Sequence, residues 1–530
     1  MRANRFIVQA TLLTRCLAAL GSGALAVFAM PPFGLSPVLL ISFPVLVWLL
    51  DNVNKERQLR ARIIQAALIG FVFGFAFFLG SVHWIGEAFL VDVERYGLLM
   101  PFAILGLSLG LAIFPAIALG LAGAFWSTSN TRVLWLACAF SFVEWLRGHV
   151  LTGFPWNAMG YALSSSEALM QMAAYIGLYG LTFFVVFVSA LPALLVAPLE
   201  RRGQGRLNRV GITAVLGSAA IIAMIWAGGS FRLRAAPLSF VPGVNIRIVQ
   251  PAVDQKLKWS PEQAVEIFEH FMTLSSREGL EKITHVVWPE SALPFFLDGN
   301  KPVLSRIDAL LPDQTFLITG AMRLGKGERG QENYFNSIEI FDGSARKVAH
   351  YDKFHLVPFG EYLPLGALLS KLGFRALVHS QGGFTPGPGL RTLIIPNAPP
   401  LGALVCYEAI FPGAVARDDV RPGWLVNVTN DAWFGDSLGP PQHLAQARMR
   451  AVEEGLPVIR AANTGISAVI DAEGRVRARL GINTTGVIDF GLPKPRQPTF
   501  YAHFADLPFW LIIIFSGGFY GFYRLRRPRR

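Results

Sequence analysis

The chain has 530 residues, of which 53% are hydrophobic and only 15% are charged. This composition excludes an ordinary soluble globular protein and leaves room for several membrane spans beside a separate domain. The formal net charge of +12 would suit a nucleic-acid-binding protein, so the positions of the charges have to decide its meaning.

Long uncharged runs fill the N-terminal part of the chain, and one more lies near its C-terminus. A helix needs about 20 apolar residues to cross the hydrocarbon core of a bilayer. The runs predict about eight transmembrane helices, at 12–30, 34–50, 63–82, 98–125, 133–149, 170–197, 211–229 and 507–523. We therefore expect a membrane-embedded α-helical bundle of about seven spans in residues 1–230. An extramembrane domain follows in 231–506, and a last span with a basic tail in 507–530.

Most of the net positive charge falls in three short segments, 51–62, 200–209 and the tail after residue 523. Cytoplasmic loops of membrane proteins are enriched in Lys and Arg, so these segments indicate topology and not a nucleic-acid-binding surface. A path of eight spans that starts in the cytoplasm puts all three segments there, together with both termini. It puts residues 231–506 on the other side, which for a bacterial inner membrane is the periplasm.

From residue 244 onward, short β-branched runs alternate with helical patterns. The pattern predicts strands at 244–250, 283–290, 315–321, 334–342, 402–408 and 424–431, and in the segments "PVIRAA" and "SAVIDAEG". It predicts helices over 260–279, capped by Ser260 with Pro261 in the first position, and over about 441–455. Such alternation is typical of an α/β layered domain.

Polar side chains collect where the predicted strands end. Glu290 follows "VVWP", Cys406 follows "GALV", and residues 427–431 follow "WLV". Lys353 and Glu361 lie in "YDKFHLVPFGEYLP", a loop punctuated by Pro and Gly. Because ligands of open α/β sheets bind beyond the carboxyl ends of the strands, we expect these side chains to share one cleft.

Cys406 is the only one of the three cysteines outside strongly apolar sequence, and nothing suggests a disulfide framework. A nucleophilic thiol needs a base or a nearby cation to become a thiolate. Glu290 can accept its proton, and Lys353 and the backbone N–H of Tyr407 can stabilise an oxyanion. This combination predicts acyl transfer through a thioester.

Other interpretations stay open on these residues alone. A Cys at a strand end often packs in a core, a Pro-Glu pair often makes a turn, and a loop Lys is often solvated. The histidines 355, 379 and 443 show no metal-ligand spacing and no nucleotide-binding motif is present, so we expect neither a metal nor a cofactor. A membrane-tethered amidase that hydrolyses C–N bonds is one competing function. A transporter with a sensory domain is another, although it would need more charge inside the spans.

The motif regions "WPESALP" with Glu290, "YDKFHLVPFGEYLP" with Lys353 and "VCYEAIFP" with Cys406 resemble those of the nitrilase superfamily. The whole layout, with "NVTNDAWFGDSLGPPQHLAQARMRAVEEG", "NTGISAVID" and "QKLKW", is similar to that of the apolipoprotein N-acyltransferases. The first resemblance implies an αββα sandwich with a Glu-Lys-Cys triad.

The second resemblance implies a periplasm-facing enzyme of the bacterial inner membrane. Such an enzyme takes a fatty acyl chain from a phospholipid, commonly phosphatidylethanolamine, and adds it to the α-amine of a diacylglyceryl-cysteine on an apolipoprotein. Carried over by position, Cys406 is the acylated nucleophile, Glu290 the base and Lys353 the oxyanion stabiliser. The resemblance gives supporting roles to Glu361, Tyr407 and Glu408, and a substrate-binding role to Trp259.

Apolar loops near the motifs are consistent with a lipid substrate. The segments 292–296, 363–374 and 432–434 are rich in large apolar residues, and such patches on a soluble face usually signal an interface. We expect them to lie at the bilayer surface as lids over the acyl entrance, with Leu368 and Leu369 among the contacts.

Overall fold

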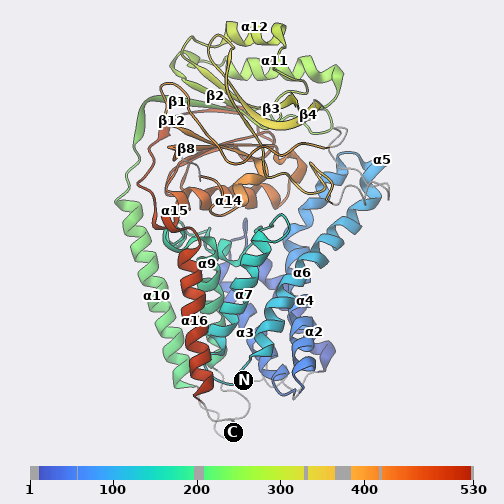
Figure 1. Cartoon of the computed structure of the whole chain (residues 1–530), viewed down its shortest axis with the longest axis vertical. Coiled ribbons are helices and arrows are strands. Elements are labelled where there is room, and N and C mark those ends of the chain that lie inside the picture. Colours follow the sequence, from blue (N-terminus) through green and yellow to red (C-terminus); the bar gives the residue numbers. More distant parts are fainter. Residues whose placement is uncertain are drawn as a thin grey trace. The chain divides into compact units, whose positions relative to one another are not determined.

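The computed structural model describes residues 11–56, 58–195, 208–326, 332–364, 383–416 and 420–526. The chain forms two compact units, the first of residues 1–235 with 500–530 and the second of residues 236–499 (Figure 1).

The first unit is helical. Its long helices are α2 (Leu12–Val27), α3 (Leu39–Val53), α4 (Leu59–Val82), α6 (Met100–Ala124), α7 (Arg132–His149), α9 (Ala173–Ala190), α10 (Arg209–Arg234) and α16 (Leu507–Leu525). Shorter helices are α5 (Val93–Tyr96), α8 (Glu167–Met170) and α15 (Phe500–Phe504). Each of the eight predicted apolar runs coincides with a long helix. Five helical segments within the described residues are long and apolar enough to cross a membrane, so the chain is a multi-pass membrane protein and the count of eight spans stays a prediction.

Glycines let three of these helices approach closely. A Cβ on Gly23 of α2 would lie 2.1 Å from the carbonyl oxygen of Phe73 in α4. A Cβ on Gly70 of α4 would lie 2.2 Å from the carbonyl oxygen of Pro115 in α6. Small residues are the usual means by which membrane helices bring their backbones together.

The two charges that interrupt the apolar run of α7 are buried and neutralise each other. Arg147 Nη2 lies 2.9 Å from Glu144 Oε2, and Arg147 Nη1 donates to the carbonyl oxygen of Trp156 at 2.9 Å. A paired and hydrogen-bonded charge is far cheaper to bury than an isolated one, so the run is compatible with a helix inside the bundle.

The second unit contains two six-stranded sheets. The first has the order β12-β1-β2-β3-β4-β5 and the second the order β11-β10-β9-β8-β7-β6. The first comprises β1 (Phe240–Gln250), β2 (His285–Trp288), β3 (Phe316–Lys326), β4 (Glu332–Phe341), β5 (Lys347–Asp352) and β12 (Gly486–Pro493). The second comprises β6 (Thr392–Leu393), β7 (Leu401–Val405), β8 (Trp424–Thr429), β9 (Val458–Ala462), β10 (Ala468–Ile470) and β11 (Val476–Arg479). Each sheet has three parallel strands, β1-β2-β3 and β7-β8-β9, and antiparallel strands beyond them.

The two sheets pack face to face and helices cover their outer faces. Ile248 of β1 and Val287 of β2 share one buried core with Val405 of β7 and Val428 of β8. On the outer faces, α11 (Ala264–Ser275) and α12 (Lys301–Leu310) cover the first sheet, and α14 (Gly439–Glu454) covers the second (Figure 1). The unit is therefore an αββα sandwich, the fold that the resemblance implied.

The start of the first helix differs from the prediction. Pro261–Gln263 form a 3₁₀ turn, α11 begins at Ala264, and Ser260 makes no side-chain cap to the backbone. The Ser260 hydroxyl donates to the carboxylate of Glu262 instead.

Candidate active site

The end of β7 turns sharply at Cys406. The predicted strand ran through residue 408, but β7 ends at Val405 and Cys406–Ile410 form a 3₁₀ turn. Cys406 has a φ of 49°, in the left-handed region that residues other than glycine rarely adopt. Strain of this kind costs about 1–3 kcal/mol and is found where a site requires it. The turn takes the cysteine out of the regular alternation of the strand.

The carboxylate of Glu290 is fixed by two hydrogen bonds. Asn336 Nδ2 donates to Oε1 at 2.7 Å, and the backbone N–H of Asn430 donates to Oε2 at 2.8 Å. Glu290 follows β2 and is 7% exposed. It is therefore a largely buried carboxylate whose two oxygens each have a defined partner.

Lys353 lies between two carboxylates. Its Nζ is 2.9 Å from Glu361 and 3.8 Å from Oε1 of Glu290. Asn336 Nδ2 also donates to Glu361 Oε1 at 2.7 Å, and the N–H of Val357 donates to Oε2 at 2.8 Å. Burial alone would lower the pKa of Lys353, but Glu361 and Glu290 together raise it above its ordinary value. The lysine therefore stays charged at neutral pH.

Cys406 is buried in the same group of charges. Burial raises the pKa of its thiol well above the ordinary value, Glu290 adds to the rise, and Lys353 opposes it. The resting side chain is thus a thiol that needs a base, and Glu290 is close enough to act on it electrostatically. The structure brings Glu290, Lys353, Glu361 and Cys406 together in one buried group.

A second charged group supports the backbone of Cys406. The ring of His443 lies with Nε2 3.2 Å from the carbonyl oxygen of Cys406 and Nδ1 2.9 Å from Oδ1 of Asp431. Arg460 Nη2 lies 2.7 Å from Oδ2 of Asp431. Burial would raise the pKa of Asp431, but Arg460 and His443 hold it well below its usual range. The Asp431–Arg460 ion pair is thus internally neutralised.

Glu408 joins the segment of Lys353 to the turn of Cys406. One oxygen accepts from the N–H of Phe354 at 2.9 Å, and the other accepts from the N–H of Val405 at 2.8 Å. Further hydrogen bonds come from the Tyr351 hydroxyl at 2.8 Å and the His355 N–H at 3.2 Å. Burial raises the pKa of Glu408 to about 7 against these donors.

The two remaining predicted site residues differ in their surroundings. Tyr407 is buried, and its ring meets that of Phe411 edge-on at 5.0 Å. Trp259 is 40% exposed, and within the described residues no hydrogen bond or ring contact joins it to the triad. Its neighbour Lys258 reaches the site instead, with Nζ 3.1 Å from the carbonyl oxygen of Glu290.

Sequence reasoning missed three hydrogen-bond donors to Glu290, which are the side chains of Asn336 and Lys258 and the backbone N–H of Asn430. Asn336 stands in the strand "YFNSIEIF", where an amide among apolar neighbours is a signal because a buried polar side chain needs partners. The signal for Lys258 is weaker, because a lysine in a turn is usually solvated.

The predicted apolar lids are contradicted at one segment and stay a prediction at the other two. Leu368 and Leu369 lie outside the described residues. Ala292 and Leu293 are buried in the core beneath α11, so the prediction that they form an exposed lid was wrong. Residues 432–434 are half-buried.

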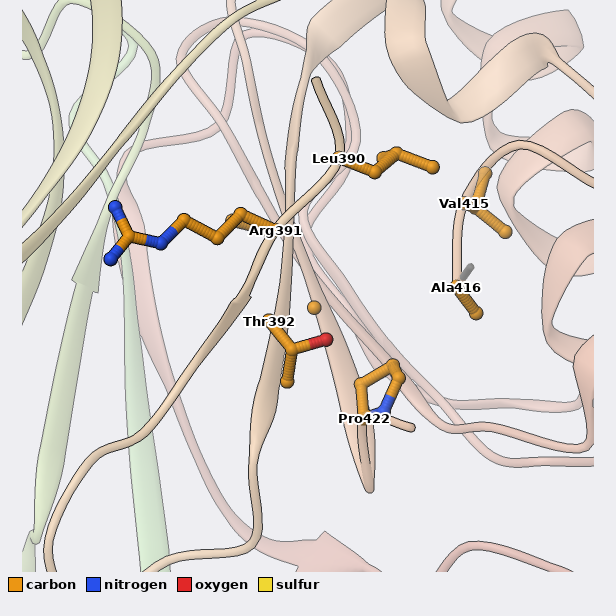
Figure 2. Close-up of a pocket in the computed structure, with 8 residues that line it drawn as sticks. Leu390, Arg391, Thr392, Val415, Ala416 and Pro422 are labelled. Carbon is orange, nitrogen blue, oxygen red and sulfur yellow. The ribbon is translucent and has the colours of Figure 1, made fainter. Parts of the chain in front are cut away.

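A small hollow elsewhere in the second unit holds none of the site residues. Figure 2 shows Leu390, Arg391 and Thr392 on one side of it and Val415, Ala416 and Pro422 on the other. Its volume of about 10 Å³ is enough for roughly one water molecule. The described residues also contain no group of three or more His, Cys, Asp or Glu that could hold a metal ion.

Comparison with known proteins extends over nearly the whole chain. The model of the apolipoprotein N-acyltransferase N-terminal domain matches residues 22–191, and that of carbon-nitrogen hydrolases matches residues 245–494. The apolipoprotein N-acyltransferase of Rhodopseudomonas palustris is 44% identical, over 93% of this chain and 92% of its own length. That of Bradyrhizobium diazoefficiens is 46% identical, over 95% of each chain.

Among solved structures, an amidase variant from Nesterenkonia of the nitrilase superfamily is similar to 49% of this chain and 94% of its own, with 19% identity and a TM-score of 0.36. The two family models and the near-complete coverage of the relatives lead to one conclusion. The chain belongs to the apolipoprotein N-acyltransferase family and is an acyltransferase.

Proposed function

We propose that this acyltransferase moves a fatty acyl chain from a phospholipid to the α-amine of the N-terminal diacylglyceryl-cysteine of an apolipoprotein, through a thioester on Cys406. The observation that carries the proposal is the arrangement of Glu290, Lys353 and Glu361 around a buried thiol. A base, a cation and a thiol in one buried group are what thioester chemistry needs.

In the first half-reaction Glu290 takes the proton from Sγ of Cys406, and the thiolate attacks the ester carbonyl carbon of the phospholipid. The negative charge that forms on the carbonyl oxygen is stabilised by the ammonium of Lys353 and the N–H of Tyr407. The C–O bond to glycerol breaks, and the departing oxygen takes the proton from Glu290. The products are a lysophospholipid and an acyl-enzyme.

In the second half-reaction the amine of the apolipoprotein attacks the thioester carbonyl. Glu290 takes a proton from the nitrogen, the C–S bond breaks, and Sγ regains that proton. Cys406 returns to the thiol, and the product carries a new amide bond. The cycle needs no metal and no cofactor, because every proton moves between Glu290, the sulfur and the substrates.

Glu361 and Glu408 act as supports in this scheme. Glu361 holds Lys353 by an ion pair of 2.9 Å, and Glu408 ties the segment of Lys353 to the turn of Cys406. Trp259 offers an exposed ring for contact with substrate beside the buried Lys258. The burial of Glu290, Lys353 and Cys406 favours a dry thioester, which lets the amine compete with water.

We place the protein in the bacterial inner membrane, with the sandwich in the periplasm and both termini in the cytoplasm. The basic segments at 51–62, 200–209 and after residue 523 support this orientation. Phosphatidylethanolamine is the proposed acyl donor.

The test is acyl transfer by the purified full chain from labelled phosphatidylethanolamine to a diacylglyceryl peptide, followed by mass spectrometry. Cys406→Ala should abolish the labelled amide, whereas Cys16→Ala in α2 should leave it unchanged. Transfer that persists in Cys406→Ala would contradict the proposal. Release of ammonia from short amides by the wild type, without acyl transfer, would favour the amidase function instead.

A further inference from the structure

A lysine outside the triad is buried beside Glu290. Lys258 lies in the turns that follow β1, and it is 2% exposed. Its Nζ donates a hydrogen bond of 3.1 Å to the backbone carbonyl oxygen of Glu290. Burial lowers the pKa of Lys258 to about 8, and the negative charge of Glu290 opposes that shift. Lys256, two residues earlier, is exposed and serves as a reference for a lysine in the same turns.

The segment that carries Lys258 is tied to the same carboxylate by a second route. Gln255 Oε1 accepts from Asn430 Nδ2 at 2.7 Å. The backbone N–H of Asn430 in turn donates to Glu290 Oε2 at 2.8 Å. The backbone N–H of Lys258 donates to the carbonyl oxygen of Asp254 at 3.0 Å. Two sets of hydrogen bonds thus fix the position of Lys258 relative to Glu290, one through its own Nζ and one through Gln255 and Asn430.

Lys258 contributes to the charge balance of the site. Glu290 and Glu361 face the single ammonium of Lys353, which leaves one negative charge in excess among these three groups. Lys258 supplies the missing positive charge at Glu290, where its Nζ bonds to the backbone carbonyl oxygen.

The other charged groups around the site do not supply that balance. Asp431 is paired with Arg460 at 2.7 Å, and His443 lies against them both. Glu408 accepts hydrogen bonds from the backbone N–H groups of Phe354 and Val405, and burial raises its pKa to about 7. Asp254 is exposed in the turn. Within the part of the chain that the structure describes, Lys258 is therefore the cation that offsets the second carboxylate.

The positive charge of Lys258 matters because a proton moves between Cys406 and Glu290 during catalysis. Cys406 and Glu290 together hold one proton in the reactive form, whichever of the two carries it, and the pair then has one negative charge. With two protons the pair is neutral and cannot attack. A nearby positive charge stabilises the negative charge that the pair carries in this form.

We propose that Lys258 is a positioning residue of the acyl-transfer site, whose positive charge stabilises the negative charge that the Cys406–Glu290 pair carries in its reactive form, and whose hydrogen bond holds the Glu290 backbone. The proposal rests on the proposed function, in which Glu290 takes the proton of Cys406. In that step the S–H bond breaks and an O–H bond forms on Glu290, and the total charge of the pair does not change.

The experiment measures alkylation of Cys406 by iodoacetamide in the full chain, without any lipid substrate. The sulfur attacks the reagent, a C–S bond forms, iodide leaves, and the proton goes to Glu290. Peptide mass spectrometry separates Cys406 from Cys16 and Cys138. Rates are compared between about pH 6 and about pH 9 for the wild type, Lys258→Met and Lys258→Arg, with Lys256→Met as the matched control.

Lys258→Met should react about tenfold more slowly than the wild type near pH 6, because the variant lacks the buried positive charge, and an opposite charge favours the charged form of its neighbour by about this factor or more. The difference between the two rates should shrink toward pH 9, where Lys258 is largely neutral in the wild type, and the part that remains there reflects the lost hydrogen bond to the Glu290 backbone. Lys258→Arg and Lys256→Met should follow the wild type at the acidic end.

Three results would overturn the proposal. First, the alkylation rate of Lys258→Met could match that of the wild type at every pH. Second, it could be lower by the same factor at every pH, as a purely structural role requires. Third, Lys258→Arg could react as slowly as Lys258→Met near pH 6. Because no lipid is present, these outcomes concern Lys258 alone. Failure of the proposed function would show separately, as acyl transfer that does not depend on Cys406.

Discussion

Lys353 Nζ lies 2.9 Å from the carboxylate of Glu361 and 3.8 Å from that of Glu290. Glu361 therefore holds the lysine, whose ammonium also faces Glu290. Two carboxylates with different partners can perform different tasks. Glu361 is fully engaged by Lys353, Asn336 and the N–H of Val357. Glu290 acts electrostatically on the thiol of Cys406, and the proposed proton transfers are assigned to it for that reason.

Glu361→Gln should lower kcat/KM by about 10- to 100-fold, because the amide no longer attracts Lys353 and a shift of about 1 Å in a catalytic group can cost that much. The protein should remain folded, since the substitution preserves shape. Steady-state acyl transfer measures the effect, with the exposed Glu281→Gln as control. Unchanged kcat/KM in Glu361→Gln would contradict the role of Glu361 as the support of Lys353.

Asn336→Asp should be more damaging than Asn336→Ala. Asn336 Nδ2 donates to Glu290 and Glu361 at 2.7 Å each, and an aspartate would set a third carboxylate against both. Each hydrogen bond to a charged group contributes about 1.5–3 kcal/mol, so both variants should lose stability and activity. Thermal unfolding and acyl transfer check this order. Equal effects of the two variants would show that charge repulsion is unimportant here.

Acid should destabilise the protein partly through His285. This side chain is buried between the sheets, stacked on Phe316, and burial lowers its pKa to about 4 from the ordinary 6.5. The unfolded chain therefore binds a proton at higher pH than the folded chain does. The stability is present above pH 6.5 and is lost as the pH falls toward 4, by about 3 kcal/mol at most.

His285→Phe should remove this loss, because a phenyl ring fits among Phe316 and Trp424 and binds no proton. Thermal unfolding at about pH 7 and about pH 5 should show a smaller fall in Tm for this variant than for the wild type. The exposed His503→Phe is the control and should behave like the wild type. An identical fall in His285→Phe would mean that other groups dominate the acid response.

The sequence predicted those parts of the fold that local patterns encode. Strand β8 reads "WLVNVT" and is buried on both faces, as central parallel strands are, and it was recognised as a strand. Strand β12 was missed, because its place beside β1 depends on pairing across more than 200 residues of chain. No periodicity within residues 486–493 indicates that they pair with β1.

The site was predictable where motifs mark it and not where tertiary contacts create it. The clustering of Glu290, Lys353 and Cys406 followed from strand ends and from resemblance. The left-handed turn at Cys406 was not predictable, since cysteine has no preference for positive φ. The contact of Lys258 with Glu290 joins positions 32 residues apart through a turn, so no local pattern favours Lys258 over the exposed Trp259 as a site residue.

The acyl-enzyme is the central claim, and the intact mass of the protein tests it most directly. The purified wild type is incubated with phosphatidylethanolamine and no acceptor, beside Cys406→Ala. We predict that the wild type gains the mass of one fatty acyl group, that neutral hydroxylamine removes it, and that Cys406→Ala gains nothing. An unmodified wild type under conditions in which an added apolipoprotein acceptor still becomes acylated would contradict the thioester mechanism.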